Sequence, residues 1–148
     1  MQEVPKIEIV RITIIDEMTT EMCFVNTGSK RNTAILILPA LGVPARSYSK
    51  LLLCLAKVGY NAAVFDLRSQ GNSSVTAGKG INYGYHELLT EDIPAAIREV
   101  YALFGQRIKL LGHSLGGQLG SLYATSNDSR IESLILCTSC SVYFKSWK

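Results

Sequence analysis

A serine flanked by glycines is the part of this sequence whose residue types could do chemistry. Residues 112–116 read Gly-His-Ser-Leu-Gly, which matches the pattern G-x-S-x-G. An apolar run over residues 108–111 precedes the pattern, and a segment of helical character follows it. A strand, a sharp turn and a helix in this order are typical of a nucleophile elbow, in which an exposed serine hydroxyl attacks a carbonyl carbon. The pattern therefore predicts Ser114 as a nucleophile.

The two glycines of the pattern have a steric reason in such a turn. The chain doubles back so tightly that we expect Gly112 and Gly116 to leave no room for a Cβ atom. The alternative interpretation is a glycine-rich turn between a strand and a helix with an incidental serine, because a bare G-x-S-x-G also occurs by chance.

A serine nucleophile needs a neighbouring base, and the sequence offers only two histidines. His113 adjoins Ser114, and we expect its side chain to point away from the hydroxyl and to pack in the fold. His86 precedes a predicted helix at the same sheet edge as the serine, but no acid is evident to fix its tautomer. We therefore favour a polar loop residue for His86 over a catalytic base.

Metal, redox and nucleotide sites are not expected. Of the four cysteines, Cys23, Cys54, Cys137 and Cys140, the last two match C-x-x-C. A redox pair normally opens a helix, whereas this one closes a predicted strand, and a zinc site needs further ligands at suitable spacing. No glycine-rich stretch fits a dinucleotide-binding motif or a P-loop. The sequence therefore predicts free thiols and no cofactor.

Length and composition indicate one globular domain of 148 residues, with 47% hydrophobic and 18% charged residues. The net charge of +3 comes from 15 basic and 12 acidic residues scattered along the chain, so a nucleic-acid partner is not expected. The first residues do not resemble a signal peptide, and no apolar run reaches the roughly 18 residues of a membrane span. We expect a cytoplasmic protein with no membrane partner.

Alternating strands and helices are predicted around the serine. Residues 6–15 and 21–26 form an antiparallel pair, and continuous apolar runs predict buried strands over residues 33–38, 61–66, 107–111 and 131–137. Helices are expected over residues 45–58, over 91–104 with Thr90 as N-cap, and over 115–125, where Gly116, Gly120 and Ala124 make a stripe of small residues. Residues 67–84 read as a long loop. The fold class is α/β, with a mostly parallel sheet, an antiparallel N-terminal hairpin and helices on both faces.

With these elements in order, the chain resembles the α/β-hydrolase fold superfamily. More narrowly, it resembles the bacterial predicted α/β hydrolases of the serine aminopeptidase-like type. Residues 38–45 (LPALGVPA) follow the third strand, where the superfamily usually opens its oxyanion loop with His-Gly. Residues 66–73 (DLRSQGNS) are similar to the superfamily's D-x-R-G-x-G-x-S loop, with Ser69 in place of the first glycine. For Asp66 and Arg68 we favour a salt-bridged loop.

The resemblance implies hydrolysis of a small-molecule ester, thioester or amide through an acyl-enzyme on Ser114. The oxyanion hole would be formed by the backbone N–H of Leu115 and one N–H from the loop after the third strand. Counting from the usual His-Gly assigns the second donor to Leu41, with Gly42 as the alternative. A plain connecting loop over residues 39–44 is also open.

The resemblance also implies that part of the active site is missing from residues 1–148. The superfamily places the acid after the seventh strand and the histidine after the eighth, whereas Asp128 and Glu132 lie before the last strand of this chain. We therefore expect an incomplete domain, truncated after the sixth strand. The alternative function is a catalytically inactive N-terminal fragment or a partner-dependent half-domain. The last strand would then be an open edge that pairs with a complementing C-terminal segment or with a second copy.

Overall fold

A mixed six-stranded sheet forms the centre of the computed structural model, which describes residues 5–29 and 33–139. The strand order is β1-β2-β4-β3-β5-β6. β1 runs antiparallel to β2 and β2 antiparallel to β4, while β4, β3, β5 and β6 are parallel. The strands are β1 (Ile7–Ile15), β2 (Met18–Val25), β3 (Thr33–Leu38), β4 (Ala62–Phe65), β5 (Arg107–His113) and β6 (Ile131–Cys137). The predicted fold class is confirmed.

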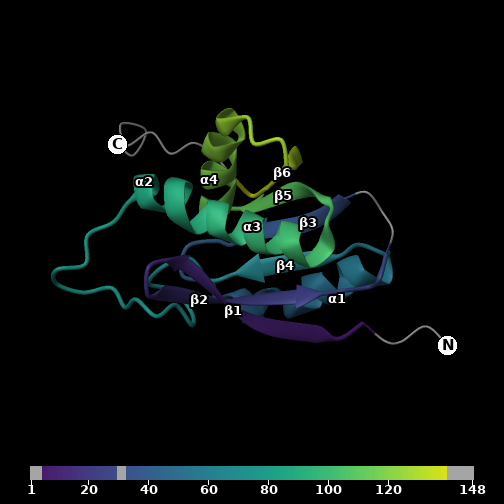
Figure 1. Cartoon of the computed structure of the whole chain (residues 1–148), viewed down its shortest axis with the longest axis horizontal. Helices are drawn as coiled ribbons and strands as arrows, with labels where there is room; N and C mark the ends of the chain where they lie inside the picture. Colours follow the sequence, from purple (N-terminus) through teal and green to yellow (C-terminus); the bar gives the residue numbers. More distant parts are fainter. Residues whose placement is uncertain (1–4, 30–32, 140–148) are drawn as a thin grey trace.

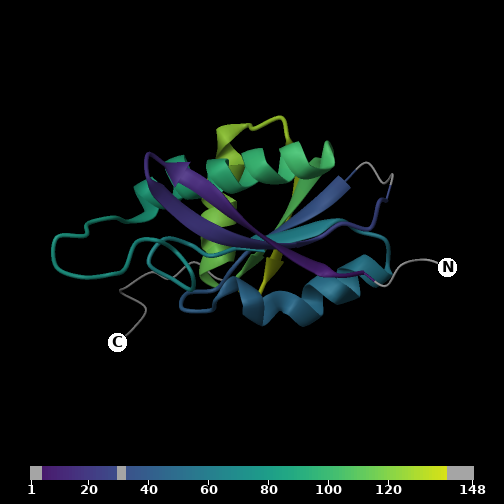
Figure 2. The ribbon, with the colours of Figure 1, turned by 60° about the horizontal axis from the view of Figure 1, so that its bottom comes forward.

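Helices cover both faces of this sheet (Figures 1 and 2). α1 (Ser49–Lys57) packs Leu52 against Ile35 and Ile37 on one face. α3 (Ile93–Phe104) and α4 (Leu115–Tyr123) pack against Leu36 and Leu38 on the other. Since successive side chains of a strand point to opposite faces, β3 is buried along its whole length and needs an uninterrupted apolar sequence.

The helical run before β5 begins earlier than its sequence pattern predicts. α2 (Tyr85–Glu87), a π-helical turn η2 (Leu88–Asp92) and α3 follow one another without a break. The predicted role of Thr90 as N-cap is wrong, because its hydroxyl lies inside the run and donates to the carbonyl of His86 at 2.8 Å. The run is capped instead by Glu87, whose carboxylate accepts the N–H of Gly84 at 2.6 Å. A proline cannot donate within a helix, and the wider π turn ends at Asp92, two residues before Pro94.

Two further boundaries differ in detail. β2 begins at Met18, so the hairpin link is a two-residue turn over residues 16–17 rather than a longer polar segment. The helix predicted over residues 45–58 starts with a 3₁₀ turn, η1 (Ala45–Tyr48). A third short helix, η3 (Ala124–Ser126), follows α4.

The carboxyl ends of the parallel strands bring the predicted site segments to one edge. Leu38 at the end of β3 is paired with Gly112 near the end of β5. The loop after β3 and the turn after β5 therefore leave the sheet side by side. The long loop over residues 67–84, which follows β4, leaves the same edge and projects from the body of the molecule (Figures 1 and 2).

Candidate active site

Ser114 is the single residue between the end of β5 at His113 and the start of α4 at Leu115. Its backbone has φ 52° and ψ −114°, a conformation that residues other than glycine rarely adopt, and Ser114 is exposed. The N–H of Ser114 donates to the carbonyl of Cys137 at 3.1 Å, and its own carbonyl accepts the N–H of Gly117 at 2.9 Å. The strained turn is thus held by neighbouring backbone, and it leaves the hydroxyl at the surface.

The glycines around Ser114 allow this turn to form. A Cβ atom on Gly112 would lie 2.4 Å from the Cα atom of Gly117, and one on Gly116 would lie 1.9 Å from the carbonyl oxygen of Leu38. Gly120 also packs closely on the sheet, with Leu134 at 2.9 Å from its Cβ position. Ala124 does not continue the stripe, because α4 ends at Tyr123 and Ala124 is exposed.

Ser139, which no sequence pattern singles out, supports the elbow from the segment after β6. Its hydroxyl lies 3.2 Å from the carbonyl oxygens of both Gly112 and Ser114. Only its position after the last strand could have drawn attention to it. Of the C-x-x-C match, Cys137 is a free thiol at the end of β6, and Cys140 lies outside the described residues.

The loop after β3 makes a tight turn over residues 40–43. The carbonyl of Ala40 accepts the N–H of Val43 at 3.2 Å, and Gly42 at the third position has φ 72°. A positive φ at this position is typical of a type II turn, which favours glycine there. Leu41 occupies the second position and is 72% exposed.

Two backbone N–H groups of this loop are bound by side chains from other segments. Ala40 donates to the Tyr48 phenol oxygen at 2.9 Å, and Gly42 donates to the Gln70 side-chain oxygen at 2.6 Å. By contrast, the N–H groups of Leu41 and Leu115 make no hydrogen bond within residues 5–29 and 33–139. One open donor therefore remains on the loop and one at the start of α4.

Both histidines lie near this edge of the sheet. The Nδ1 atom of His113 is 2.8 Å from the Tyr48 hydroxyl, and the two rings meet edge to face at 5.9 Å. His86 is exposed on α2, which contacts α4 through a 2.6 Å hydrogen bond from the hydroxyl of Tyr85 to Gln118. Among the described residues, no hydrogen bond or ion pair joins a histidine to a carboxylate.

The aspartate that begins the loop motif over residues 66–73 has a structural role. Asp66 is buried, and its two oxygens accept the N–H groups of Ala45 at 2.6 Å and Asn72 at 2.9 Å. The predicted salt bridge within the motif is therefore wrong for Asp66. Arg68 does form a salt bridge, but with partners outside the motif: its guanidinium binds Asp92 at 2.6 Å and also contacts Glu91.

Burial raises the pKa of Asp92, while hydrogen bonds from Arg68 oppose that shift. This buried pair fastens the loop to the helical run, because Asp92 also accepts the backbone N–H of Arg68 at 2.9 Å. Asp92 is 1% exposed, so it has no surface from which to reach a substrate.

Asp128 and Glu132 lie at the amino end of β6, the edge opposite to Ser114. Asp128 is bound by Arg130 at 2.7 Å, and the hydrogen bonds from this guanidinium lower the pKa of Asp128 to about 2. Glu132 binds Lys109 at 2.9 Å. Neither carboxylate is placed to orient a histidine beside Ser114.

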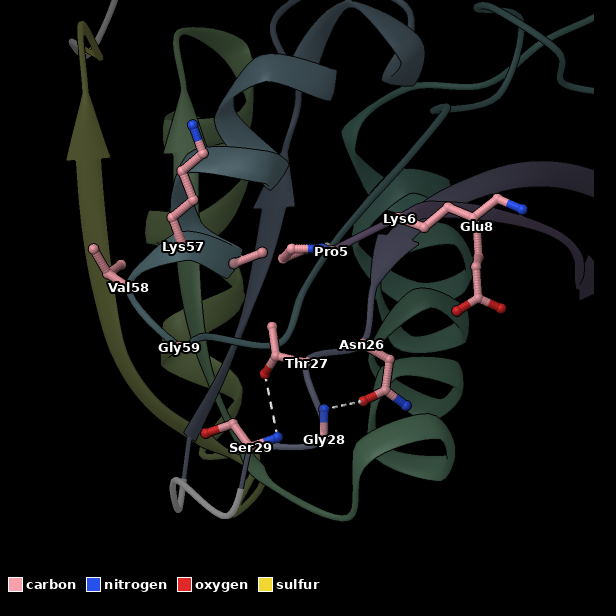
Figure 3. A pocket seen from close by; sticks show the side chains of 11 residues that line it. Pro5, Lys6, Glu8, Asn26, Thr27, Gly28, Ser29, Lys57, Val58 and Gly59 are labelled. Carbon is pink, nitrogen blue, oxygen red and sulfur yellow. Dashed lines mark hydrogen bonds between the residues drawn. The ribbon is translucent and has the colours of Figure 1, made fainter. Parts of the chain in front are cut away.

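A pocket of about 1290 Å³ opens at the far end of the sheet (Figure 3). It is lined by residues that precede β3 and β4, such as Thr27 and Gly59, and by Lys57 of α1. The N–H groups of Gly28 and Ser29 are bound within this segment at 2.9 and 3.2 Å. Since the catalytic edge of a parallel sheet lies at the carboxyl ends of its strands, this pocket is separate from Ser114.

The described chain offers no grouping of metal ligands: nowhere in residues 5–29 and 33–139 do three histidine, cysteine or acidic side chains cluster. In the same ranges, no helix has the length and apolar character needed to cross a bilayer.

The elbow, the loop beside it and the order of the strands point to one family, and a family model for the alpha/beta hydrolase fold matches residues 33–148. The chain belongs to the α/β-hydrolase fold family. No curated protein matches this family member in a sequence search.

Solved structures share the fold at low sequence identity. The structure of DcsB in complex with a substrate analogue is 20% identical, with a TM-score of 0.73 over 90% of this chain and 46% of DcsB. A membrane phospholipase A described as a bacterial virulence factor is 21% identical, with a TM-score of 0.69 over 95% of this chain and 41% of that one. The esterase Pf2001 of Pyrococcus furiosus is 21% identical, with a TM-score of 0.72 over 91% of this chain and 52% of the esterase. This α/β hydrolase chain thus spans about half the length of these structures.

Proposed function

We propose that this chain carries the nucleophile and the oxyanion hole of a serine hydrolase that acts on a small-molecule ester, thioester or amide. The observation that carries the proposal is Ser114 itself, an exposed serine held at a positive φ between β5 and α4. Structures with this fold include an esterase and a phospholipase A, which supports acyl transfer as the reaction class. A cytoplasmic location stays a prediction from the sequence.

In the proposed reaction, the Ser114 oxygen attacks the carbonyl carbon of the substrate while its proton passes to a base. The carbonyl oxygen becomes an oxyanion, which the open N–H groups of Leu115 and Leu41 stabilise. Collapse of this tetrahedral intermediate expels the leaving group and leaves an acyl-enzyme on Ser114. Leu41 is preferred to Gly42 as the second donor, because the N–H of Gly42 is already bound by Gln70.

The base and the acid of this reaction would come from sequence after residue 148. This inference rests on the lack of a carboxylate partner for His86 and His113 within the described chain, and on the greater length of the structures that share the fold. The same observations favour the second candidate, a catalytically inactive N-terminal fragment or a half-domain that depends on a partner.

Labelling with a fluorophosphonate probe separates the two candidates. For the 148-residue chain we expect slow labelling at Ser114, located by mass spectrometry. Labelling should become about 100- to 10,000-fold faster when the downstream coding sequence supplies a histidine and an acid, since this is the usual contribution of a general base. Ser114→Ala should abolish labelling. Ser121→Ala, a serine on α4 whose hydroxyl binds the carbonyl of Gly117, is the control and should not change it. If Ser114 is unlabelled both with and without that segment, the inactive fragment is the correct interpretation.

A further inference from the structure

Tyr48 lies between the two halves of the proposed site. It belongs to η1, in the segment after β3, whereas its phenol reaches the last residue of β5. Its oxygen accepts the N–H of Ala40 at 2.9 Å and lies 2.8 Å from Nδ1 of His113. Ala40 directly precedes Leu41, and His113 directly precedes Ser114. One side chain thus touches the neighbours of both the loop donor and the nucleophile.

The direction of these hydrogen bonds follows from the chemistry of the groups. A phenol has a single hydrogen, and the backbone N–H of Ala40 can only donate. The Tyr48 oxygen therefore accepts from Ala40. Its own hydrogen has no acceptor other than Nδ1 of His113 among the described residues, so we assign the hydrogen bond in this direction. His113 must then be the neutral tautomer that carries its hydrogen on Nε2. Burial raises the pKa of Tyr48, so that the phenol keeps this hydrogen at neutral pH.

The contact acts on the turn that presents the Leu41 N–H. Residues 40–43 form this turn, and Tyr48 binds its first residue while Gln70 binds Gly42. Both Ala40 and Tyr48 are buried, at 7% and 8% exposure, so water cannot replace the phenol without rearrangement of the loop. Fixing the residues on both sides of Leu41 fixes the direction of the N–H between them.

We propose that Tyr48 is a positioning residue. Through its hydrogen bonds to Ala40 and His113, it holds the Leu41 N–H at a fixed position relative to Ser114. The proposal rests on the proposed function, in which Leu41 and Leu115 stabilise the oxyanion. It assigns no direct contact with the substrate to Tyr48. Its effect is to hold two segments of the oxyanion hole in one geometry before the substrate arrives.

Substitution of the phenol tests this role in the labelling reaction. Tyr48→Phe keeps the ring but removes the oxygen, and should slow labelling of Ser114 by about 100-fold, the loss expected when a reacting group is misplaced by about 1 Å. His113→Asn keeps an acceptor close to the position of Nδ1 and should retain most of the wild-type labelling rate. His113→Leu removes this acceptor and should slow labelling as much as Tyr48→Phe does. Tyr101→Phe, at an exposed tyrosine of α3, is the matched control and should not change the rate.

Nuclear magnetic resonance of the same variants gives a readout that does not need turnover. The wild-type chain should show ¹⁵N shifts of His113 for the tautomer protonated at Nε2. Tyr48→Phe should move the amide signals of Leu41 and Ala40, while Tyr101→Phe should leave them in place.

The two measurements separate this proposal from the proposed function. A tautomer protonated at Nδ1 overturns the assigned direction of the hydrogen bond to His113. Amide signals of Leu41 unmoved by Tyr48→Phe overturn the positioning role, whether or not Ser114 reacts. Unchanged labelling of Tyr48→Phe, in a chain whose labelling depends on Ser114, overturns it as well. Absence of labelling both with and without the downstream segment overturns the serine hydrolase, and the magnetic resonance result then decides the positioning geometry alone.

Discussion

Ser69 replaces a glycine of the family motif in this chain, and its backbone keeps the conformation that glycine would favour. Its φ is 60°, and its hydroxyl is buried without a hydrogen-bond partner within the described chain. A left-handed conformation costs a residue with a Cβ atom about 1–2 kcal/mol, and an unsatisfied buried hydroxyl costs about 1–3 kcal/mol. The sequence shows that serine replaces glycine here, but only the backbone angle shows that the loop keeps the conformation that glycine favours.

Ser69→Gly should therefore stabilise the protein. Glycine relieves both costs but loses about 0.5–1 kcal/mol through the greater freedom of the unfolded chain, so we expect a net gain of about 1–4 kcal/mol in the free energy of unfolding. Ser69→Ala removes only the hydroxyl and should gain less. Urea unfolding of the three proteins measures the difference. An alanine variant that is more stable than the glycine variant would show that φ at this position carries no strain.

At the scale of elements, the close approach of α4 to the sheet depends on Gly116. Its Cβ position lies 1.9 Å from the carbonyl oxygen of Leu38, a backbone atom of β3 that cannot rotate away. The helical spacing of small residues predicted this contact, and Gly120 shares it. The sequence did not show where the contact ends, because Ala124 lies beyond the last turn of α4.

Gly116→Ala should push α4 away from β3 and lower the free energy of unfolding by about 3 kcal/mol or more, the upper range for overpacking. Gly78→Ala provides the matched control, since nothing lies within 4 Å of its Cβ position. This control should change stability by less than about 0.5 kcal/mol. Denaturation midpoints followed by circular dichroism give the comparison. Equal midpoints for the two variants would contradict a close contact between the helix and β3.

For the whole molecule, the two edges of the sheet differ in how they are protected. β1 carries Glu8 and Arg11 as exposed charges and has an irregular register near its end. β6 has one charged residue, Glu132, at its start, and exposes Ile135 at 41% and Leu136 at 53% on opposite faces. Charges and irregularities discourage pairing of edge strands, whereas a long uncharged apolar edge favours it. β6 is therefore the edge at which another strand would add.

We predict that the 148-residue chain associates through β6. A lysine on this edge should oppose strand addition, so Leu136→Lys should raise the monomer fraction in sedimentation at micromolar concentration. Val58→Lys changes an equally exposed apolar residue after α1 and should leave association unchanged. A monomeric wild-type chain with a single sharp unfolding transition would contradict the prediction.

The sequence by itself determined the order of the elements, the family and the elbow, because each depends on residues that are neighbours along the chain. Apolar runs mark buried strands, and a serine between glycines marks the turn after β5. Only the tertiary structure decided which N–H groups of the oxyanion loop are bound. Their acceptors are side chains 8 and 28 residues away, and the contact of Tyr48 with His113 spans 65 residues. Such hydrogen bonds depend on how strands and loops are brought together, so no local pattern encodes them.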